Sequence, residues 1–244
     1  MTRPDGAAAL VTGASRGIGA AVARALARDG WVVGVNYRSD PDAARAVVEQ
    51  IEVGGGTAAA LHGDVTAADD VEGLFKALEE RHGPVLCVVN NAGVRADGLA
   101  ARLAVEDWRR LHAVNLDAAF LVARRALGPM LRARFGRIVN VASGIALRAN
   151  PGQSAYTAAK SGLIGFTRAL ATEVARRGVT VNAVAPGVID TEMVADVLAG
   201  AAEHIPARRV GTPDEVAACV RFLTSDEAAY VNGATLAVDG ALTA

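Results

Sequence analysis

The sequence predicts an α/β fold: a doubly wound, seven-stranded parallel sheet with helices on both faces. Short apolar runs alternate with longer stretches of helical periodicity along the whole chain, which is typical of strand–helix–strand units. Most of these runs also lack the in-and-out alternation of a half-exposed strand, as a sheet covered on both faces requires. The predicted strands are Ala7–Val11, Trp31–Asn36, Thr57–Leu61, Val85–Val89, Arg137–Val141, Val179–Val184 and Thr235–Val238.

Helical stretches fall between these strands, and the last has a clear start signal. Thr212 is its expected N-cap, Pro213 its first residue, and Glu215 completes a capping box. No linker or repeat divides the chain, so residues 1–244 are expected to form a single domain. The predicted helices are Ile18–Asp29, Pro41–Val53, Ala67–Arg81, Val105–Arg134, Ser154–Arg177 and Pro213–Leu223.

Composition excludes several classes of protein. The 244 residues include 26 acidic and 25 basic side chains, which argues against a general nucleic-acid binder. No apolar run reaches the roughly 18 residues needed to cross a bilayer, and the first run breaks at Gly13, unlike a signal peptide. Cys87 and Cys219 form no CxxC pair and no histidines have ligand spacing, so no disulfide framework or metal site is expected. We expect a cytoplasmic protein that binds neither nucleic acid nor membrane.

A glycine-rich segment directly follows the first predicted strand and opens the first helix. It reads Thr12-Gly13-Ala14-Ser15-Arg16-Gly17-Ile18-Gly19. Glycines there let the backbone turn sharply and approach a pyrophosphate, whose charge is stabilised at the helix N-terminus. The spacing differs from the G-x-G-x-x-G fingerprint, and glycines at such a turn are often merely structural. Its position between strand and helix favours a dinucleotide-binding loop.

The end of the second predicted strand indicates which dinucleotide binds. An NAD site places an acidic residue there for the ribose 2′-hydroxyl, but this strand is followed by Arg38. Arg38 and Arg16 together would bind a 2′-phosphate through charge-assisted, bidentate hydrogen bonds. Alternatively, Arg38 is a solvated loop residue and Asp40 only the N-cap of the next helix. We prefer NADPH as the cofactor.

Tyr156 and Lys160 lie four residues apart in a predicted helix, so both side chains project from one face. A tyrosine with a pKa near 10 is a poor acid–base group at neutral pH. An ammonium about 5 Å away would stabilise the phenolate by roughly 3 kcal/mol, or about two pKa units. Alone, the pair is also compatible with an ordinary helix face. The upstream glycine loop, and Ser143 at the end of a central strand, favour acid–base catalysis.

Taken together, the ordered motifs resemble those of short-chain dehydrogenases/reductases, which have a Rossmann-type fold, over essentially the full length. This resemblance implies an oxidoreductase in which the cofactor supplies hydride and the protein orients a carbonyl. The matching segments are Thr12–Gly19, Asp64-Val65, Asn90-Asn91-Ala92-Gly93, Asn115, Ser143, Tyr156 with Lys160, Pro186-Gly187, Val231-Asn232-Gly233 and Val238-Asp239-Gly240.

The resemblance implies a role for each matching residue. Ser143 would hydrogen-bond the substrate carbonyl oxygen, and Tyr156 would protonate it. Lys160 would lower the pKa of Tyr156 and bind the nicotinamide ribose, and Asn115 would hold a water that links Lys160 to solvent. Further residues implied at the cofactor are Gly13, Ser15, Arg16, Gly17, Ile18, Gly19, Arg38, Asp64, Val65, Asn91, Ala92, Gly93, Pro186, Gly187, Val188 and Thr191.

Within this family the sequence is most similar to 3-oxoacyl-acyl-carrier-protein reductases and polyketide ketoreductases, through residues 150–153, 160–167 and 177–182. The similarity implies NADPH-dependent reduction of a 3-oxoacyl thioester. One alternative is a reductase of a free alcohol, sugar or steroid, which shares every catalytic residue. Another is a non-catalytic dinucleotide-binding regulator, which would be expected to lack part of the catalytic set.

Two departures from those reductases leave the acyl substrate open. In the loop after Gly93 the arginine, Arg95, stands one position earlier than usual, and Ala241 stands where a glycine is common. The segment Thr191–Pro206 is either a mobile lid or an amphipathic connecting helix at the edge where doubly wound enzymes bind ligands.

Four arginines lie near the C-terminal ends of the two long predicted helices: Arg132, Arg134, Arg176 and Arg177. Such a patch would attract an acidic acyl-carrier protein, although basic residues at these positions also offset helix macrodipoles. Small residues along both helices, and the pairing of these helices in family members, imply a homotetramer. The alternative is that these helices pack only against the chain's own sheet.

The scarcity of lysine generates a test of the catalytic pair. Of the 25 Lys and Arg residues only Lys76 and Lys160 are lysines. A guanidinium is wider and less compact than an ammonium, so Lys160→Arg should lose most activity because it fits poorly beside a phenol and a ribose. Lys76→Arg, on a predicted surface helix, should change little. Steady-state carbonyl reduction by both variants measures the difference, and equal losses would contradict the assignment.

Overall fold

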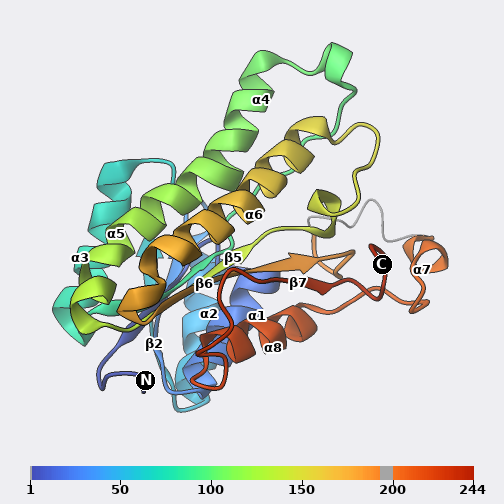
Figure 1. The fold of residues 1–244 in the computed structure, drawn as a ribbon. Helices are drawn as coiled ribbons and strands as arrows, with labels where there is room; N and C mark the ends of the chain where they lie inside the picture. Colours follow the sequence, from blue (N-terminus) through green and yellow to red (C-terminus); the bar gives the residue numbers. More distant parts are fainter. Residues whose placement is uncertain (1, 193–199) are drawn as a thin grey trace.

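The computed structural model describes residues 2–192 and 200–244. Seven strands form one parallel sheet in the order β3-β2-β1-β4-β5-β6-β7, with helices on both faces (Figure 1). The predicted fold class is confirmed, and every predicted strand is present with its ends shifted by at most two residues. The strands are β1 (Ala8–Val11), β2 (Val32–Tyr37), β3 (Thr57–His62), β4 (Val85–Asn90), β5 (Gly136–Val141), β6 (Val179–Pro186) and β7 (Thr235–Val238).

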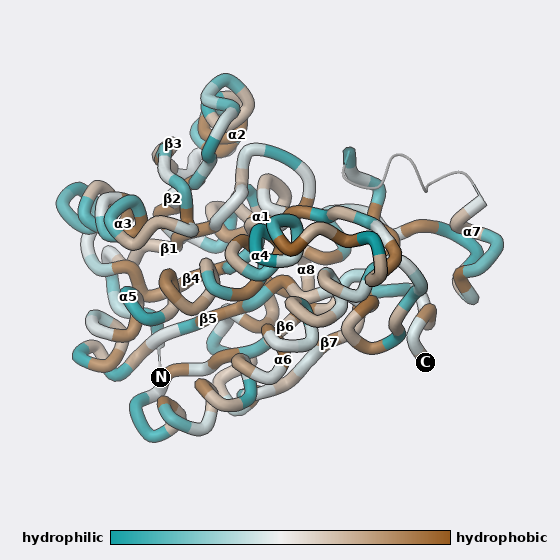
Figure 2. Tube along the Cα trace, turned by 90° about the horizontal axis from the view of Figure 1, so that it is seen from above, coloured by the Kyte–Doolittle hydropathy of each residue, from teal (hydrophilic) through white to brown (hydrophobic). Residues whose placement is uncertain are grey.

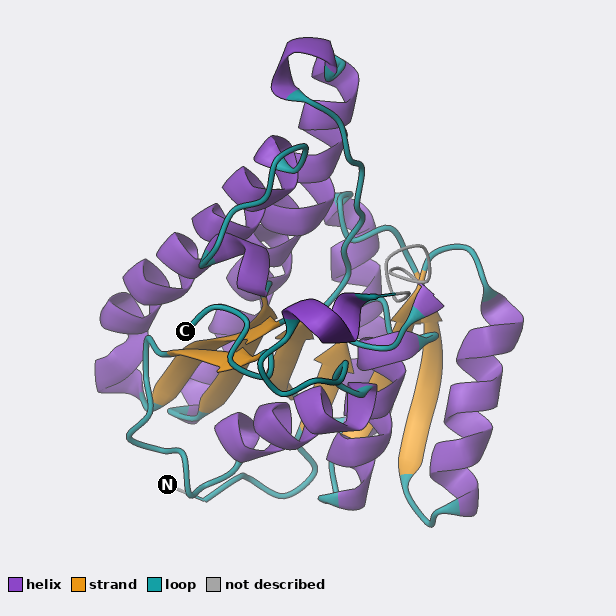
Figure 3. Ribbon diagram, turned by 90° about the vertical axis from the view of Figure 1, so that its right-hand side faces the viewer, coloured by secondary structure: helices purple, strands orange, loops and turns teal. Residues whose placement is uncertain are grey.

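The helices form two layers with the sheet between them (Figure 3). On one face α1 contacts both α2 and α8, and on the other α3 contacts α5 while α6 packs against β6. Within the described ranges, no helix is long and apolar enough to cross a membrane. The helices of these layers are α1 (Gly17–Arg28), α2 (Pro41–Val53), α8 (Pro213–Thr224), α3 (Ala68–His82), α5 (Ala118–Ala133) and α6 (Ser154–Val174).

The central strands are buried because their residues are apolar and both faces are covered. Every residue of β4, β5 and β6 is buried, and Figure 2 shows the hydrophobic colours on the central strands. Most of α1 is buried as well, and its alanines let the helix lie close to the sheet. Removing this much apolar surface from water is the main stabilising contribution to such a fold.

The predicted start signal of α8 is also confirmed. The hydroxyl of Thr212 accepts a hydrogen bond from the backbone N–H of Glu215 at 3.3 Å. The carboxylate of Glu215 accepts in return from the backbone N–H of Thr212 at 2.8 Å. This reciprocal pair satisfies two donors that the first turn of a helix leaves without partners.

One predicted helix, Val105–Arg134, is divided in the structure. It consists of α4 (Val105–His112), a π-helical turn (Ala113–Asp117) and α5. The side-chain amide of Asn115, inside the π turn, donates to the carbonyl of Leu111 at 3.0 Å. In an α-helix that carbonyl would accept from the backbone of Asn115, so the inserted side chain opens the helix at this point. Periodicity alone does not reveal such a turn.

The strand order reverses between β1 and β4, and this position creates the ligand crevice of a doubly wound sheet. The glycine loop leaves β1 here, and the segment after β4 lies beside it. The hydroxyl of Thr12 accepts from the backbone N–H groups of Asn91 at 2.9 Å and Ala92 at 3.0 Å. The two loops are therefore held together at the carboxyl edge of the sheet.

The segment Thr191–Pro206 follows β6 at the same edge. Residues 193–199 of this predicted lid or connecting helix lie outside the described residues. The part beyond them contains α7 (Ala201–His204), a single helical turn. Ala201, His204 and Ile205 line the main cavity of the protein.

Candidate active site

A cavity of about 590 Å³ lies at the carboxyl edge of the sheet. Three of the four residues predicted to be catalytic, Ser143, Tyr156 and Lys160, are in its wall. The structure therefore brings together the end of β5 and the first turns of α6. Several predicted cofactor residues line the same cavity: Ile18, Asn91, Gly93, Pro186, Gly187, Val188 and Thr191.

Lys160 is a buried residue in the wall of this cavity. Its Nζ atom donates to the carbonyl oxygen of Val141, the last residue of β5, at 2.8 Å. Burial lowers the pKa of Lys160 to about 8 because a low-dielectric surrounding disfavours the ammonium. The Nζ atom lies 5.8 Å from the centre of the Tyr156 ring. Tyr156 and Lys160 thus share one face of α6, as the spacing predicts.

The electrostatics of Tyr156 differ from the expectation. Burial raises the pKa of Tyr156, a hydrogen bond with Ser143 and the nearby charge of Arg95 lower it, and Asp97 raises it. Desolvation is the largest of these effects, so the phenol stays protonated at neutral pH. In the structure burial outweighs the effects that lower the pKa of Tyr156, so the net lowering expected from the sequence is not found, and the role of Lys160 toward the phenol stays a prediction. A protonated phenol is the form that a general acid needs.

Ser143 directly follows the buried end of β5. Its backbone is extended, and its hydroxyl accepts from the backbone N–H of Ile145 at 3.3 Å, which caps a short 3₁₀ turn (Gly144–Ala146). This turn fixes the hydroxyl at the cavity wall, where it also meets the phenol of Tyr156. Two hydroxyl groups thus converge on one point of the cavity.

Asn115 lies behind the cavity wall. Its amide donates to Val94 and Leu111 carbonyls at 2.9 and 3.0 Å, and its oxygen accepts from the backbone N–H of Val94 at 3.3 Å. A Cβ atom on Gly93 would lie 2.9 Å from that oxygen and 3.6 Å from Lys160 Nζ. Asn115 thus positions the loop after β4 beside Lys160 with both amide hydrogens in use, and its role at a water stays a prediction.

The glycine loop fits a pyrophosphate. Gly13 has φ +58°, and a Cβ atom on Gly19 would lie 2.4 Å from the carbonyl oxygen of Gly13, so neither position accepts a side chain without rearrangement. Arg16 occupies the N-cap of α1 without a side-chain capping bond, so the first N–H groups of α1 are not capped by it. Ser15 and Gly17 lie within the same loop.

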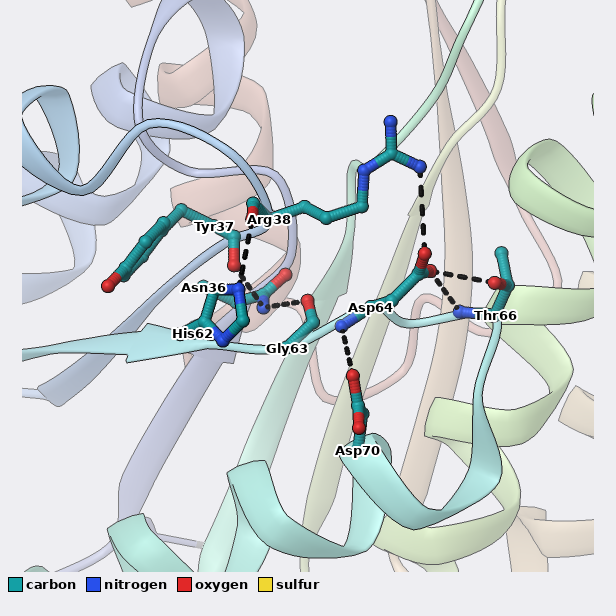
Figure 4. A network of polar contacts seen from close by, with 8 residues as sticks. All are labelled: Asn36, Tyr37, Arg38, His62, Gly63, Asp64, Thr66 and Asp70. Carbon is teal, nitrogen blue, oxygen red and sulfur yellow. Dashed lines mark hydrogen bonds and ion pairs between the residues drawn. The ribbon is translucent and has the colours of Figure 1, made fainter.

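Arg38 and Asp64 meet at the ends of β2 and β3 (Figure 4). The guanidinium lies 3.6 Å from the carboxylate of Asp64, so Arg38 forms an ion pair between the two strand ends. Hydrogen bonds from the hydroxyl and then the backbone of Thr66, followed by the charge of Arg38, lower the pKa of Asp64. Arg16, from the glycine loop, pairs with Glu192 at 2.9 Å. Both arginine side chains remain more than half exposed and so are accessible to a phosphate.

Sequence reasoning missed Asn36, which links this region to the glycine loop. Its oxygen accepts from the backbone N–H of Gly13 at 3.2 Å, and its amide donates to the carbonyl of Leu61 at 3.3 Å. The amide also donates to the carbonyl of Gly63 at 3.1 Å (Figure 4). The available signal was a polar residue at the end of an otherwise apolar strand, because such a side chain is buried only when hydrogen-bonded.

Asn91, predicted along the cofactor cleft, fastens the glycine loop from the other side. Its amide donates to the carbonyls of Thr12 and Gly13, both at 2.9 Å. Val65 and Ala92 lie together in the wall of a small internal cavity between these loops and Asn115. Within residues 2–192 and 200–244, no group of His, Cys, Asp and Glu is arranged to hold a metal ion.

Comparison with known proteins agrees with this geometry. Residues 13–243 match the family model described as enoyl-(acyl carrier protein) reductase, which is a model of short-chain dehydrogenases/reductases. The chain belongs to the short-chain dehydrogenase/reductase family. The resemblance stated from the motifs is thereby confirmed.

Two relatives of this short-chain dehydrogenase/reductase carry the same name. A 3-oxoacyl-(acyl-carrier-protein) reductase of Synechocystis sp. is 46% identical over 244 residues, 99% of each chain. Another, from Pseudomonas aeruginosa, is 42% identical over 242 residues, 98% of each chain. A solved structure from Agrobacterium tumefaciens, described as a proposed gluconate dehydrogenase, has a TM-score of 0.93 and 34% identity, covering 98% of this chain and 97% of that one.

The burial of Lys160 predicts a pH dependence of stability. The pKa of Lys160 is about 8 in the folded protein and near 10.4 in an unfolded chain. Between about pH 8 and 10.4 the unfolded chain therefore binds more protons at Lys160 than the folded protein does. The free energy of unfolding contributed by Lys160 therefore rises with pH from about 8 to 10.4, by roughly 3 kcal/mol. Urea unfolding of wild type and Lys160→Met without cofactor measures this difference.

The comparison with Lys160→Met removes the contribution of other groups. Burial raises the pKa of Cys87 to about 12, which lowers stability as the pH rises above 9, but equally in both proteins. Stability curves that run parallel from pH 7.5 to 10.5 would contradict the burial of a charged Lys160.

Proposed function

We propose that this protein is a cytoplasmic, NADPH-dependent reductase of 3-oxoacyl thioesters carried by an acyl-carrier protein or a polyketide carrier. The observation that carries the proposal is the protonated, half-buried phenol of Tyr156 beside the hydroxyl of Ser143, in a cavity next to a dinucleotide loop. The names of the two relatives support the thioester substrate. The presence of all four catalytic-set residues argues against the non-catalytic regulator.

The residues of the dinucleotide site fit NADPH. The glycine loop and the N-terminus of α1 would bind the pyrophosphate, Arg16 and Arg38 the 2′-phosphate, and Lys160 the nicotinamide ribose. Asp64 and Val65 would contact the adenine, and Val188 and Thr191 the nicotinamide amide. When bound, the cofactor supplies hydride to the carbonyl carbon.

The chain's own residues would complete the reduction. The hydroxyl of Ser143 donates a hydrogen bond to the substrate carbonyl oxygen and holds it beside the phenol. Tyr156 then gives its proton to that oxygen as negative charge develops there. Lys160 is positioned one turn along α6, where its charge favours the phenolate that remains.

Two other substrates are suggested by the comparisons. The family description names an enoyl reductase, in which a carbon–carbon double bond would be reduced. The solved structure described as a proposed gluconate dehydrogenase points to a free hydroxy acid, within the alternative class of alcohols and sugars. All three reactions use the same cofactor loop, so the substrate must be decided by turnover.

Turnover of matched substrates tests the proposed function. NADPH oxidation is followed with an acetoacetyl thioester, a crotonyl thioester, glucose and simple ketones, and NADP⁺ reduction is followed with gluconate. We expect the acetoacetyl thioester to give the highest kcat/KM because it presents a ketone beside a thioester. Turnover of gluconate or the crotonyl thioester without turnover of the acetoacetyl thioester would exclude the proposal.

Replacement of Arg38 tests the cofactor. Arg38→Asp removes one guanidinium and adds a carboxylate next to Asp64, so the KM for NADPH should rise about 10- to 100-fold. The KM for NADH should not rise in this way, because NADH has no 2′-phosphate for Arg38 to contact. Arg45→Asp on α2 makes the same charge change away from the site and is the control. NADPH use by Arg38→Asp equal to that of wild type would contradict the NADPH assignment.

We further propose a homotetramer in which an acyl-carrier protein docks on an arginine patch of one subunit and its acyl group enters the cavity of a partner subunit. The patch consists of Arg132, Arg134, Arg176 and Arg177. The patch is contiguous, because Arg134 donates to the carbonyl of Arg176 at 3.3 Å. It lies at the far ends of α5 and α6, however, roughly 30 Å from Tyr156 at about 1.5 Å per residue (Figure 1).

Antiparallel pairing of α5 and α6 with a second copy would bring the partner's patch toward this cavity. Apolar side chains on these helices support such an interface. Phe120 is 46% exposed, and its ring lies edge-on to that of Phe166 with 6.2 Å between the ring centres. Trp108 and Val105 on α4 are exposed as well.

Charge reversal separates carrier docking from helix-dipole compensation. Arg176→Glu/Arg177→Glu should raise the KM for a carrier-linked 3-oxoacyl substrate about tenfold and leave a small thioester unchanged. Arg28→Glu/Arg81→Glu, at the C-terminal turns of α1 and α3, makes the same charge change and should not discriminate. Equal effects on both substrates would contradict docking, and sedimentation as a monomer at micromolar concentration would contradict the tetramer.

A further inference from the structure

Arg95 places a guanidinium in the wall of the catalytic cavity. It follows β4, two residues after Gly93, and lines the cavity together with Ser143 and Tyr156. Its side chain is only 18% exposed. Its charge is close enough to Tyr156 to lower the pKa of the phenol. This is the arginine that stands one position earlier in the loop than is usual in the reductases this sequence resembles.

A carboxylate and an amide hold this guanidinium in place. Arg95 Nε donates to both oxygens of Asp97, at 3.1 and 2.9 Å, and its Nη2 atom donates to Oδ2 of the same carboxylate. Asp97 also accepts from the amide of Gln153 at 3.0 Å, and the hydrogen bonds from Arg95 and Gln153 lower its pKa, so it remains charged. The backbone N–H of Gly98 donates to Gly152 at 2.8 Å. The loop after β4 is thus fastened to the segment that precedes α6.

The cavity wall holds further basic side chains besides Arg95, whose own charge is paired with Asp97. Arg148 and Lys160 line it with Arg95, and among its described residues there is no Asp or Glu. Charge-assisted hydrogen bonds to a guanidinium are strengthened when both partners are shielded from water. Such a wall favours a substrate with a second oxygen acceptor near the reacting group.

We propose that Arg95 is a substrate-specificity residue that binds a second carbonyl oxygen, one methylene away from the ketone that is reduced. The proposal rests on the proposed function. A 3-oxoacyl thioester has this arrangement, with its ketone at C3 and the thioester carbonyl at C1. With the C3 oxygen at Ser143 and Tyr156, a hydrogen bond from Arg95 to the C1 oxygen fixes the rotation of the substrate. The ketone is then presented in one orientation.

The test compares a substrate that has the second carbonyl with one that lacks it. Wild type, Arg95→Met, Arg95→Lys and Arg102→Met are assayed with an acetoacetyl thioester and with 2-pentanone. If 2-pentanone is not turned over, its competitive inhibition constant replaces its kcat/KM. Arg102 is exposed in the same loop region and does not line the cavity, so Arg102→Met controls for the lost charge.

We expect Arg95→Met to lower kcat/KM for the thioester about 10- to 100-fold, with less than about twofold change for 2-pentanone. Arg95→Lys should recover part of the loss because it keeps a donor and the charge. Arg102→Met should match wild type on both compounds. Unfolding midpoints of all variants show whether the loop after β4 is still fastened to the segment before α6.

Two outcomes would overturn the inference and can be distinguished from failure of the proposed function. An equal loss on both compounds would assign Arg95 to loop structure or to the acidity of Tyr156 alone. A thioester reaction unchanged in Arg95→Met would remove Arg95 from the substrate site. Wild type that does not reduce the thioester at all would instead exclude the proposed function.

Discussion

The buried hydrogen bond from Lys160 Nζ to the carbonyl of Val141 sets the geometry of the whole site. It attaches α6 to the carboxyl end of β5, so the residue one helical turn earlier, Tyr156, and the residue two positions after Val141, Ser143, reach the same cavity. An ammonium is costly to bury unless it is hydrogen-bonded. It carries three N–H donors, and Val141 accepts one. A lysine that lines the cavity can use the others on a bound ligand.

Short polar side chains at the strand ends provide the rigidity that this arrangement needs. Thr12 and Asn91 join the loops after β1 and β4, Asn36 joins the ends of β2 and β3 to the glycine loop, and Asn115 holds the loop after β4. Each hydrogen-bonds backbone groups that would otherwise be buried without partners. The loops of a Rossmann-type crevice are thereby preorganised for their ligands, since little ordering remains to be done on binding.

The sheet was predictable from sequence because a parallel strand buried on both faces is a continuous apolar run. The pairing of Tyr156 with Lys160 was predictable because helix spacing alone places them together. Contacts between distant segments were not, since nothing local specifies them. The π turn depends on the side chain of Asn115 reaching Leu111 and Val94, and the brace on Arg95 depends on Gln153, 56 residues after Asp97. Only the folded chain brings these residues together.

The pKa of Tyr156 bears on the direction of the reaction. A phenol that gives a proton to a carbonyl must be protonated beforehand, whereas oxidation of an alcohol needs the phenolate to accept a proton. Burial raises the pKa of Tyr156 and lowers that of Lys160, and both shifts follow from the same exclusion of water. At neutral pH the site therefore holds the protonated phenol of Tyr156 beside the ammonium group of Lys160. By microscopic reversibility the same groups can oxidise, but only after the phenol has lost its proton. Burial of the pair thus holds the phenol in the form from which reduction starts, whereas oxidation by the same groups begins only once that proton has been removed.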